Sequence, residues 1–120
     1  MEVTVLIVDD HEDFRLAARR LLEAGGLRVV GEAGDIASAR VAVRELRPRL
    51  VLLDVQLPDG DGIAASHELG DEEDGRSIIL ISSRDESAYG TRVSTSPARG
   101  FIRKSDLSAA RLLSMLKASA

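Results

Sequence analysis

The chain has 120 residues, of which 44% are hydrophobic and 30% charged, with a formal net charge of −4. Its length is that of one domain and its composition that of an ordinary globular protein, which excludes a disordered or fibrous chain. The acidic balance without a basic run excludes nucleic-acid binding by this segment, and the lack of cysteine and of long apolar stretches excludes disulfides and membrane spans.

Hydrophobic patterning predicts strands and helices in strict alternation. Helical spacing of apolar residues predicts a first helix over 11–24, ended by a glycine pair. Asp35 is a suitable N-cap for a second helix, which must end before Pro48. A short third helix is expected after the loop at 57–62. Unbroken apolar runs, which are typical of buried parallel strands, lie at residues 3–8, 27–30, 50–53, 78–81 and 101–102.

The C-terminal third of the chain predicts a weak fourth helix and a regular fifth one. Ser83 and Glu86 resemble a capping box at the start of the fourth helix. Gly90 and several poor helix formers lie inside it, so it should fray more readily than its neighbours, and we expect Tyr89 to pack on it. The fifth helix is expected from about residue 105.

This alternation predicts an α/β fold, a doubly wound five-stranded parallel sheet with right-handed crossovers and helices on both faces. The expected strand order is 2-1-3-4-5, which places the first and third strands side by side at the switch point. In such sheets ligands bind just beyond the carboxyl ends of the strands. The residues that end the first and third strands are therefore the candidates for a site.

Three aspartates stand at those two strand ends. Asp9 and Asp10 end the first apolar run, and Asp54 ends the third. Two ionised carboxylates about 5 Å apart repel by roughly 3 kcal/mol at an effective dielectric near 20, so such a cluster either takes up protons or binds a cation. Mg²⁺ prefers oxygen ligands and commonly binds one or two carboxylates together with a phosphate. The pattern predicts a magnesium site that receives a phosphoryl group.

Two further polar residues follow the later strands. Ser82 ends the fourth apolar run, and Lys104 follows the fifth. In the expected strand order both strands lie next to the third, so a hydroxyl and an ammonium group can reach the same crevice. Phosphoryl transfer needs such groups around the equatorial oxygens.

On these residues the chain resembles the receiver domain of bacterial two-component response regulators. The likeness covers essentially all 120 residues, so residues 1–120 are expected to form one receiver domain of the flavodoxin-like (βα)5 type, with no effector domain in this chain. The matching positions are Asp9, Asp10, Asp54 within the stretch 53–62, Ser82, Phe101 and Lys104. Residues 30–33 and 100–104 also resemble the NarL/FixJ subfamily, whose members usually carry a C-terminal helix-turn-helix domain.

The resemblance implies a role for each matching residue. Asp54 would be the phosphoacceptor, and Lys104 would pair first with its carboxylate and then with the phosphoryl oxygens. Mg²⁺ would be held by Asp9, Asp10, Asp54 and the backbone carbonyl of Gln56. The protein would not be an enzyme beyond self-phosphorylation from small phosphodonors and self-dephosphorylation.

The resemblance also implies a switch and its partners. Ser82 would hydrogen-bond to the phosphoryl group, and Phe101 would then turn inward and repack the surface of the fourth helix, fifth strand and fifth helix. The phosphodonor would be a sensor histidine kinase, and the output a homodimer or the control of transcription. DNA would be bound only through an effector domain absent here. The location would be cytoplasmic, with no membrane contact.

The sequence departs from the family pattern at several positions. Ser105 stands where the family often has proline, which leaves the isomer of the Lys104–Ser105 peptide bond open. Phe101 lacks the hydroxyl of tyrosine, so switching is expected to depend on packing alone. Gln56 and Arg84 lie at positions that tune the phosphoryl lifetime in receiver domains.

Other interpretations remain open at this point. The aspartates could be turn residues and Phe101 a core aromatic, and we expect Ser83 to be a helix cap, residues 71–74 a solvated loop, and His11 and His67 solvated, with His11 able to tune a metal site. A magnesium-dependent phosphohydrolase is disfavoured by Gln56, because such enzymes usually have a second carboxylate there. A nucleotide-binding module lacks its glycine-rich loop. A stand-alone receiver and a phosphorylation-independent interaction domain are the remaining alternatives.

Overall fold

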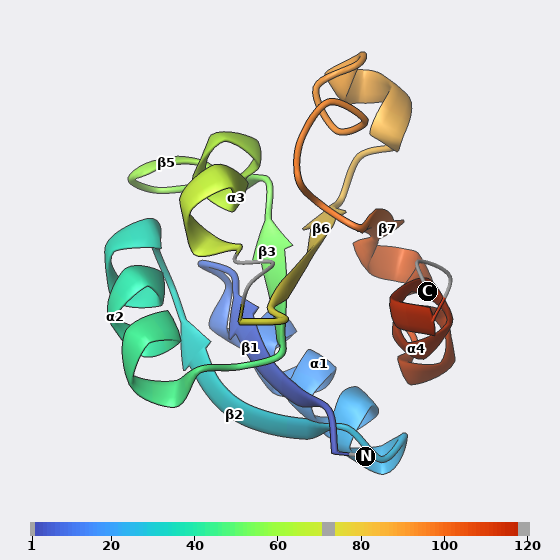
Figure 1. Ribbon diagram of the computed structural model, residues 1–120. Coiled ribbons are helices and arrows are strands. Elements are labelled where there is room, and N and C mark those ends of the chain that lie inside the picture. The colour runs from blue at the N-terminus through green and yellow to red at the C-terminus, as the bar shows by residue number, and fades with distance from the viewer. Residues whose placement is uncertain (1, 71–73, 118–120) are drawn as a thin grey trace.

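The computed structural model describes residues 2–70 and 74–117 and has a five-stranded parallel sheet between two pairs of helices (Figure 1). The strand order is β2-β1-β3-β6-β7, which confirms the predicted order 2-1-3-4-5. The main elements are β1 (Thr4–Val8), α1 (Glu12–Ala24), β2 (Arg28–Ala33), α2 (Ile36–Leu46), β3 (Leu50–Asp54), α3 (Gly62–Leu69), β6 (Ser77–Ser82), β7 (Gly100–Arg103) and α4 (Ala109–Lys117).

The side chains of the central strands point alternately to two hydrophobic cores. Leu6 and Val8 of β1 belong to the core under α2 and α3, whereas Val5 and Ile7 belong to the core under α1 and α4. This alternation follows from the two-residue period of a strand. All five residues of β3 are buried, which explains why the central strands read as unbroken apolar runs.

The ends of α2 are formed as the sequence predicts. Asp35 is the N-cap, and its carboxylate accepts a hydrogen bond of 2.8 Å from the amide N–H of Ser38. The helix ends at Arg47, which adopts a left-handed conformation with φ of 47° just before Pro48.

The loop at 57–62 contains a small hairpin that the sequence did not indicate. Strands β4 (Gln56–Leu57) and β5 (Gly60–Asp61) pair antiparallel. Between them, the Asp59 carboxylate accepts hydrogen bonds from the amides of Ile36 and Ala37 at 2.8 and 3.0 Å, and so caps α2 from another part of the chain. These bonds fix the segment that follows Asp54.

The prediction of an α-helix after the fourth strand of the sheet is wrong. After β6 the chain forms only a 3-10 helix, η1 (Glu86–Tyr89), followed by turns to Pro97. Ser83 is not its cap, because the residue before η1 is Asp85 and no side chain caps it. Gly90 has a φ of 59°, and the Thr95 hydroxyl donates to the Thr91 carbonyl, so local bonds replace a helical ladder.

The last helix begins later than predicted. Residues Lys104–Asp106 form a second 3-10 helix, η2, and α4 starts at Ala109. Within α4, Leu112 is fully buried, and Leu113 and Leu116 are partly buried against the same core. Of the acidic loop expected at 71–74, residues 71–73 lie outside the described residues. Within the described ranges, none of the helices is both long and apolar enough to cross a bilayer.

Gly62 is required by the close approach of α3 to the end of β3. A methyl group at Gly62 would lie 1.9 Å from the carbonyl oxygen of Asp54, and the Gly62 amide donates to the Val55 carbonyl at 2.7 Å. We expect Gly62→Ala to lower the free energy of unfolding by about 1 to 3 kcal/mol, because backbone atoms must move. Urea denaturation followed by circular dichroism measures this. Gly34→Ala is the control, because its nearest neighbour would be Nη1 of Arg15 at 3.6 Å, an ordinary van der Waals distance, and an equal loss in both variants would contradict the steric reason.

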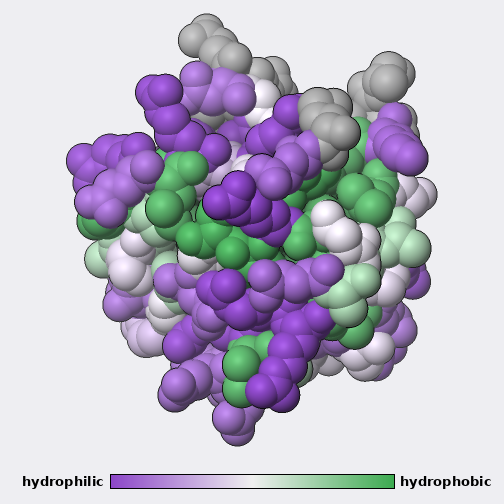
Figure 2. All heavy atoms as spheres, turned by 90° about the horizontal axis from the view of Figure 1, so that it is seen from below, coloured by the Kyte–Doolittle hydropathy of each residue, from purple (hydrophilic) through white to green (hydrophobic). Residues whose placement is uncertain are grey.

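The face at the amino ends of the strands is separate from the predicted site. Figure 2 shows the molecule from below, where hydrophobic residues form a band between hydrophilic ones. A cavity of about 420 Å³ at this end is lined by Val3, Leu113, Leu116 and several polar residues. Val3 precedes β1, whereas Asp9 follows it, so the cavity and the three aspartates lie at opposite ends of the sheet.

Candidate functional site

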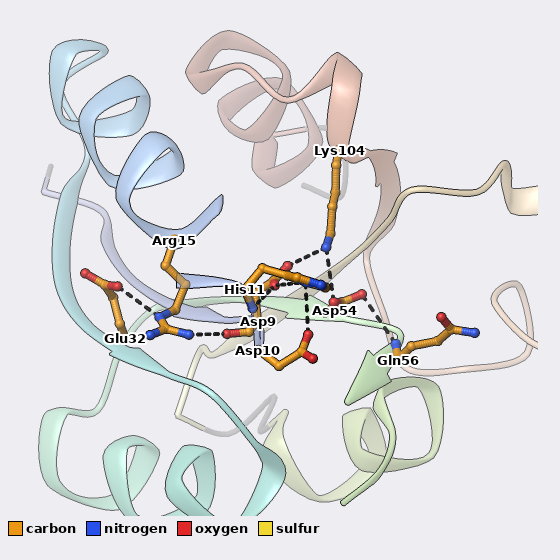
Figure 3. A network of polar contacts seen from close by, with 8 residues as sticks. All are labelled: Asp9, Asp10, His11, Arg15, Glu32, Asp54, Gln56 and Lys104. Carbon is orange, nitrogen blue, oxygen red and sulfur yellow. Dashed lines mark hydrogen bonds and ion pairs between the residues drawn. The ribbon is translucent and has the colours of Figure 1, made fainter. Parts of the chain in front are cut away.

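The three aspartates converge at the carboxyl ends of β1 and β3, as predicted (Figure 3). Because Val8 pairs with Leu53 in adjacent parallel strands, the next residues, Asp9 and Asp54, are neighbours. Asp9 is fully buried and Asp54 is 4% exposed, whereas Asp10 faces solvent.

His11 joins this acidic cluster. One potential ligand atom from each of Asp9, Asp10, His11 and Asp54 lies within 4.8 Å of the others. The Nδ1 atom of His11 is 3.1 Å from a carboxylate oxygen of Asp9 and 3.1 Å from one of Asp10. The ring is otherwise exposed, so His11 borders the site from the solvent side, while His67 is exposed on α3.

Lys104 enters the site from η2 and contacts both buried carboxylates. Its Nζ atom is 2.7 Å from Oδ2 of Asp9 and 3.2 Å from Oδ2 of Asp54. The ammonium group also lies 4.8 Å from the centre of the Phe14 ring, so this aromatic ring borders the site next to Lys104. Among the described residues no peptide bond is cis, so Lys104–Ser105 is trans and the lysine reaches the carboxylates without the cis bond often found in the family.

The charges of the site perturb one another. Burial, and next the negative charge of Asp9, raise the pKa of Asp54 to about 6, although Lys104 and the amide of Gln56 act in the opposite direction. Burial alone would lower the pKa of Lys104, but the Asp9 and Asp54 carboxylates outweigh it and raise that pKa. Lys104 therefore stays charged and only partly compensates the two buried carboxylates.

The donor set fits a hard divalent cation. Oδ2 of Asp9 is buried and has the Lys104 ammonium at ion-pair distance, but no partner with hydrogen-bond geometry among the described residues. An incompletely satisfied buried oxygen beside two further carboxylates matches the oxygen ligands that Mg²⁺ takes. The residues that would hold it are the three aspartates.

Gln56 lies beside the site through its backbone. Its amide donates to Oδ1 of Asp54 at 3.3 Å, and its side chain is exposed. The predicted use of its carbonyl as a metal ligand remains a prediction.

Ser82 is buried at the end of β6, and it has a partner that the sequence did not indicate. Its Oγ accepts a hydrogen bond from the amide of Arg84 at 3.0 Å and lies 2.5 Å from the hydroxyl of Tyr89. The expected packing of Tyr89 on a fourth helix is therefore wrong. Its hydroxyl instead contacts Ser82 at the end of β6. Its ring centre is 6.0 Å from that of Phe101, which is half-buried.

Arg15 is a second neighbour of the site that sequence reasoning missed. Its Nη1 donates to the backbone carbonyl of Asp9 at 2.6 Å, and its Nε donates to Glu32 at 3.1 Å. Burial would raise the pKa of Glu32, but Arg19 and Arg15 outweigh it and hold that pKa below its usual range. Arg15 and Arg19 lie one turn apart on α1, and this spacing was the sequence signal that both side chains share one face of the helix.

Comparison with known proteins identifies the family. The family model of the response regulator receiver domain matches residues 5–117. The chain belongs to the family of response regulator receiver domains.

The sequences of related response regulators agree with the resemblance to the NarL/FixJ subfamily. The chain is 44% identical over 88 residues to the DNA-binding transcriptional activator DevR/DosR of Mycobacterium tuberculosis, covering 72% of this chain and 41% of that protein. It is 32% identical over 103 residues to the response regulator GacA of Pseudomonas protegens, covering 85% of this chain and 48% of that protein. The chain thus spans about half the length of these relatives.

A solved structure shows the same fold. The signal receiver domain of NarL from Mycobacterium tuberculosis superposes with a TM-score of 0.84 at 31% identity, covering 97% of each chain. This agreement extends over nearly the whole chain.

Proposed function

We propose that this receiver domain is a phosphorylation-controlled switch in which Asp54 accepts a phosphoryl group from a sensor histidine kinase. The observation that carries the proposal is the convergence of the Asp9, Asp10 and Asp54 carboxylates, with the Lys104 ammonium 2.7 and 3.2 Å from two of them. A raised pKa near 6 still leaves Asp54 mostly ionised at neutral pH and thus able to attack.

The chemistry is an in-line displacement. A carboxylate oxygen of Asp54 forms a bond to phosphorus while the bond from phosphorus to the histidine nitrogen breaks, and its electron pair returns to the imidazole. Asp9, Asp10, Asp54 and the Gln56 carbonyl would hold Mg²⁺, which would supply positive charge to neutralise the phosphoryl group. The Lys104 ammonium moves from the carboxylate to a phosphoryl oxygen.

The output follows from contacts that exist only after transfer. The Ser82 hydroxyl donates to a phosphoryl oxygen, and Phe101 then repacks with the surface formed by η1, β7 and α4. These three elements stand where the sequence predicts the fourth helix, the fifth strand and the fifth helix. A changed surface supports a phosphorylation-dependent homodimer. Because the relatives include a DNA-binding activator, we infer that transcription is regulated in the cytoplasm through a DNA-binding domain outside residues 1–120.

Phosphorylation by acetyl phosphate tests the proposal. Intact-protein mass spectrometry is expected to show one phosphoryl group in the presence of Mg²⁺ and none in EDTA, with peptide mapping to Asp54. Labelling at another residue would contradict the assignment of Asp54. The lack of labelling by acetyl phosphate and by a histidine kinase would identify the domain as a phosphorylation-independent interaction module.

A further inference from the structure

The Tyr89 hydroxyl makes a contact that none of the roles above uses. Tyr89 ends η1, and its Oη is 2.5 Å from Oγ of Ser82. Ser82 directly follows Ile81, which pairs with Asp54 across β3 and β6, and it is only 3% exposed. The tyrosine hydroxyl thus contacts the Ser82 hydroxyl at the end of the strand that pairs with the strand of the proposed phosphoacceptor.

The hydrogen-bond capacity of Ser82 determines what this contact can do. A serine hydroxyl has one proton and two lone pairs. The Arg84 amide donates to Oγ and occupies one lone pair. If Tyr89 also donates, both lone pairs are filled and the Ser82 proton is left for another acceptor, whereas the reverse direction would use up that proton.

A phenol is a stronger acid than an aliphatic alcohol, and so the better donor of the two. We propose that Tyr89 is a positioning residue, which donates to Ser82 Oγ and thereby directs the Ser82 proton to the phosphoryl group on Asp54. The proposal rests on the proposed function of Asp54. In a buried setting the bond from Tyr89 also polarises the Ser82 hydroxyl and makes it a stronger donor.

The ring of Tyr89 connects this bond to the rest of the domain. It lies 6.0 Å from the Phe101 ring, with the planes at 55°. On another side it lines a cavity of about 390 Å³ with Gln56 and Arg92. Arg92 forms an ion pair with Asp61, the N-cap of α3. A change at Ser82 therefore reaches the Phe101 ring on β7 through the Tyr89 side chain.

The variant Tyr89→Phe tests the proposal because it removes only the hydroxyl. The rate of Mg²⁺-dependent phosphorylation by acetyl phosphate is expected to fall about fivefold, the effect of one neutral hydrogen bond. The affinity for Mg²⁺, measured by calorimetry, is expected to stay unchanged, because within the described residues the Tyr89 hydroxyl bonds to Ser82 and to none of the three aspartates. Ser83→Ala is the matched control, since it removes an exposed hydroxyl beside Ser82 and should leave the rate unchanged.

A double-mutant cycle separates positioning from a general structural effect. If Tyr89 acts through Ser82, then Tyr89→Phe should have no further effect in a Ser82→Ala background. Equal losses in both backgrounds would overturn the proposal, as would a Tyr89→Phe variant that is phosphorylated faster than, or as fast as, the unchanged protein. If the unchanged protein is not labelled at Asp54 at all, the proposed function fails together with this inference.

The chain also offers a direct spectroscopic signal, because Tyr89 is its only tyrosine and it has no tryptophan. With tyrosine labelled by ¹³C at Cζ, a single resonance reports on the phenol. Beryllofluoride with Mg²⁺ is expected to shift this resonance in the unchanged protein and not in Ser82→Ala. A shift of equal size in both proteins would show that Tyr89 responds independently of Ser82, and would overturn the proposal.

Discussion

Replacing Asp54 by asparagine is expected to abolish phosphoryl incorporation and, at the same time, to stabilise the fold. The amide cannot attack phosphorus, so the mass spectrum should show no Mg²⁺-dependent phosphoryl group. The stability gain arises because the ionised Asp54 carboxylate is 4% exposed and next to Asp9, and burial with this repulsion raises its pKa to about 6. We expect the free energy of unfolding in EDTA to rise by roughly 1 to 3 kcal/mol at neutral pH.

The stability gained by Asp54→Asn should depend on pH. The native state keeps the Asp54 proton up to about pH 6, whereas the unfolded chain loses it near the ordinary value of 3.8. The stabilisation from this proton is therefore fully present below about pH 4 and is lost as the pH rises through 6. Asparagine has no such titration, so the advantage of the variant should grow over this interval and then level off.

Urea denaturation in EDTA at about pH 4.5 and about pH 7.5 measures this difference. Asp13→Asn, an exposed position in the first turn of α1, is the control and should keep the labelling. An Asp54→Asn variant that loses stability equally at both pH values would show that the buried carboxylate is not the unfavourable charge we infer.

The strand order and the meeting of the aspartates could be predicted because each depends on patterns that are local in the sequence. Buried parallel strands are continuous apolar runs, and right-handed crossovers leave few possible orders. Once the first and third strands are neighbours, the residues that follow them must meet. For this reason Asp9 and Asp54 were found from the sequence.

The segment from 83 to 97 shows where such patterns fail. Its weak helix signal was recognised, but the outcome depends on contacts between distant parts of the chain. Val93 is buried in the core under α2 and α3, Arg92 pairs with Asp61, and Tyr89 bonds to Ser82. None of these pairs has a fixed spacing, so tertiary contacts decide the local structure there.

The same reason applies to the β4-β5 hairpin and to Arg15. Asp59 caps α2 across 22 residues or more, and Arg15 reaches both the Asp9 carbonyl and Glu32 from α1. Only the three-dimensional arrangement brings these groups together. The groups that support the site were therefore missed, although the residues at strand ends that form it were predicted.

Replacing Lys104 by methionine is the second change with a large expected effect. Methionine keeps much of the length and the apolar stem of lysine but removes the charge that faces Asp9 and Asp54. Breaking a buried ion pair on one side commonly costs about 3 to 5 kcal/mol, and because the Lys104 side chain is 17% exposed we expect about 2 to 4 kcal/mol in EDTA.

The loss should depend on pH and on Mg²⁺. Without the lysine, which lowers the pKa of Asp54, that pKa rises further, so the native state takes up a proton more readily. Protonation removes one unpaired charge, and the destabilisation should therefore shrink as the pH falls through this higher pKa. Addition of Mg²⁺ should restore part of the stability at neutral pH, because a cation bound by the three aspartates replaces the missing charge.

Urea denaturation at about pH 8 and about pH 5, each with EDTA and with Mg²⁺, tests these expectations. Lys117→Met is the matched control, because this lysine is exposed at the end of α4 and its replacement should change stability by less than about 0.5 kcal/mol. If Lys104→Met were as stable as the unchanged protein at both pH values, Lys104 would not compensate the buried carboxylates. A stability loss that Mg²⁺ leaves unchanged would instead argue that the carboxylates do not bind the cation together.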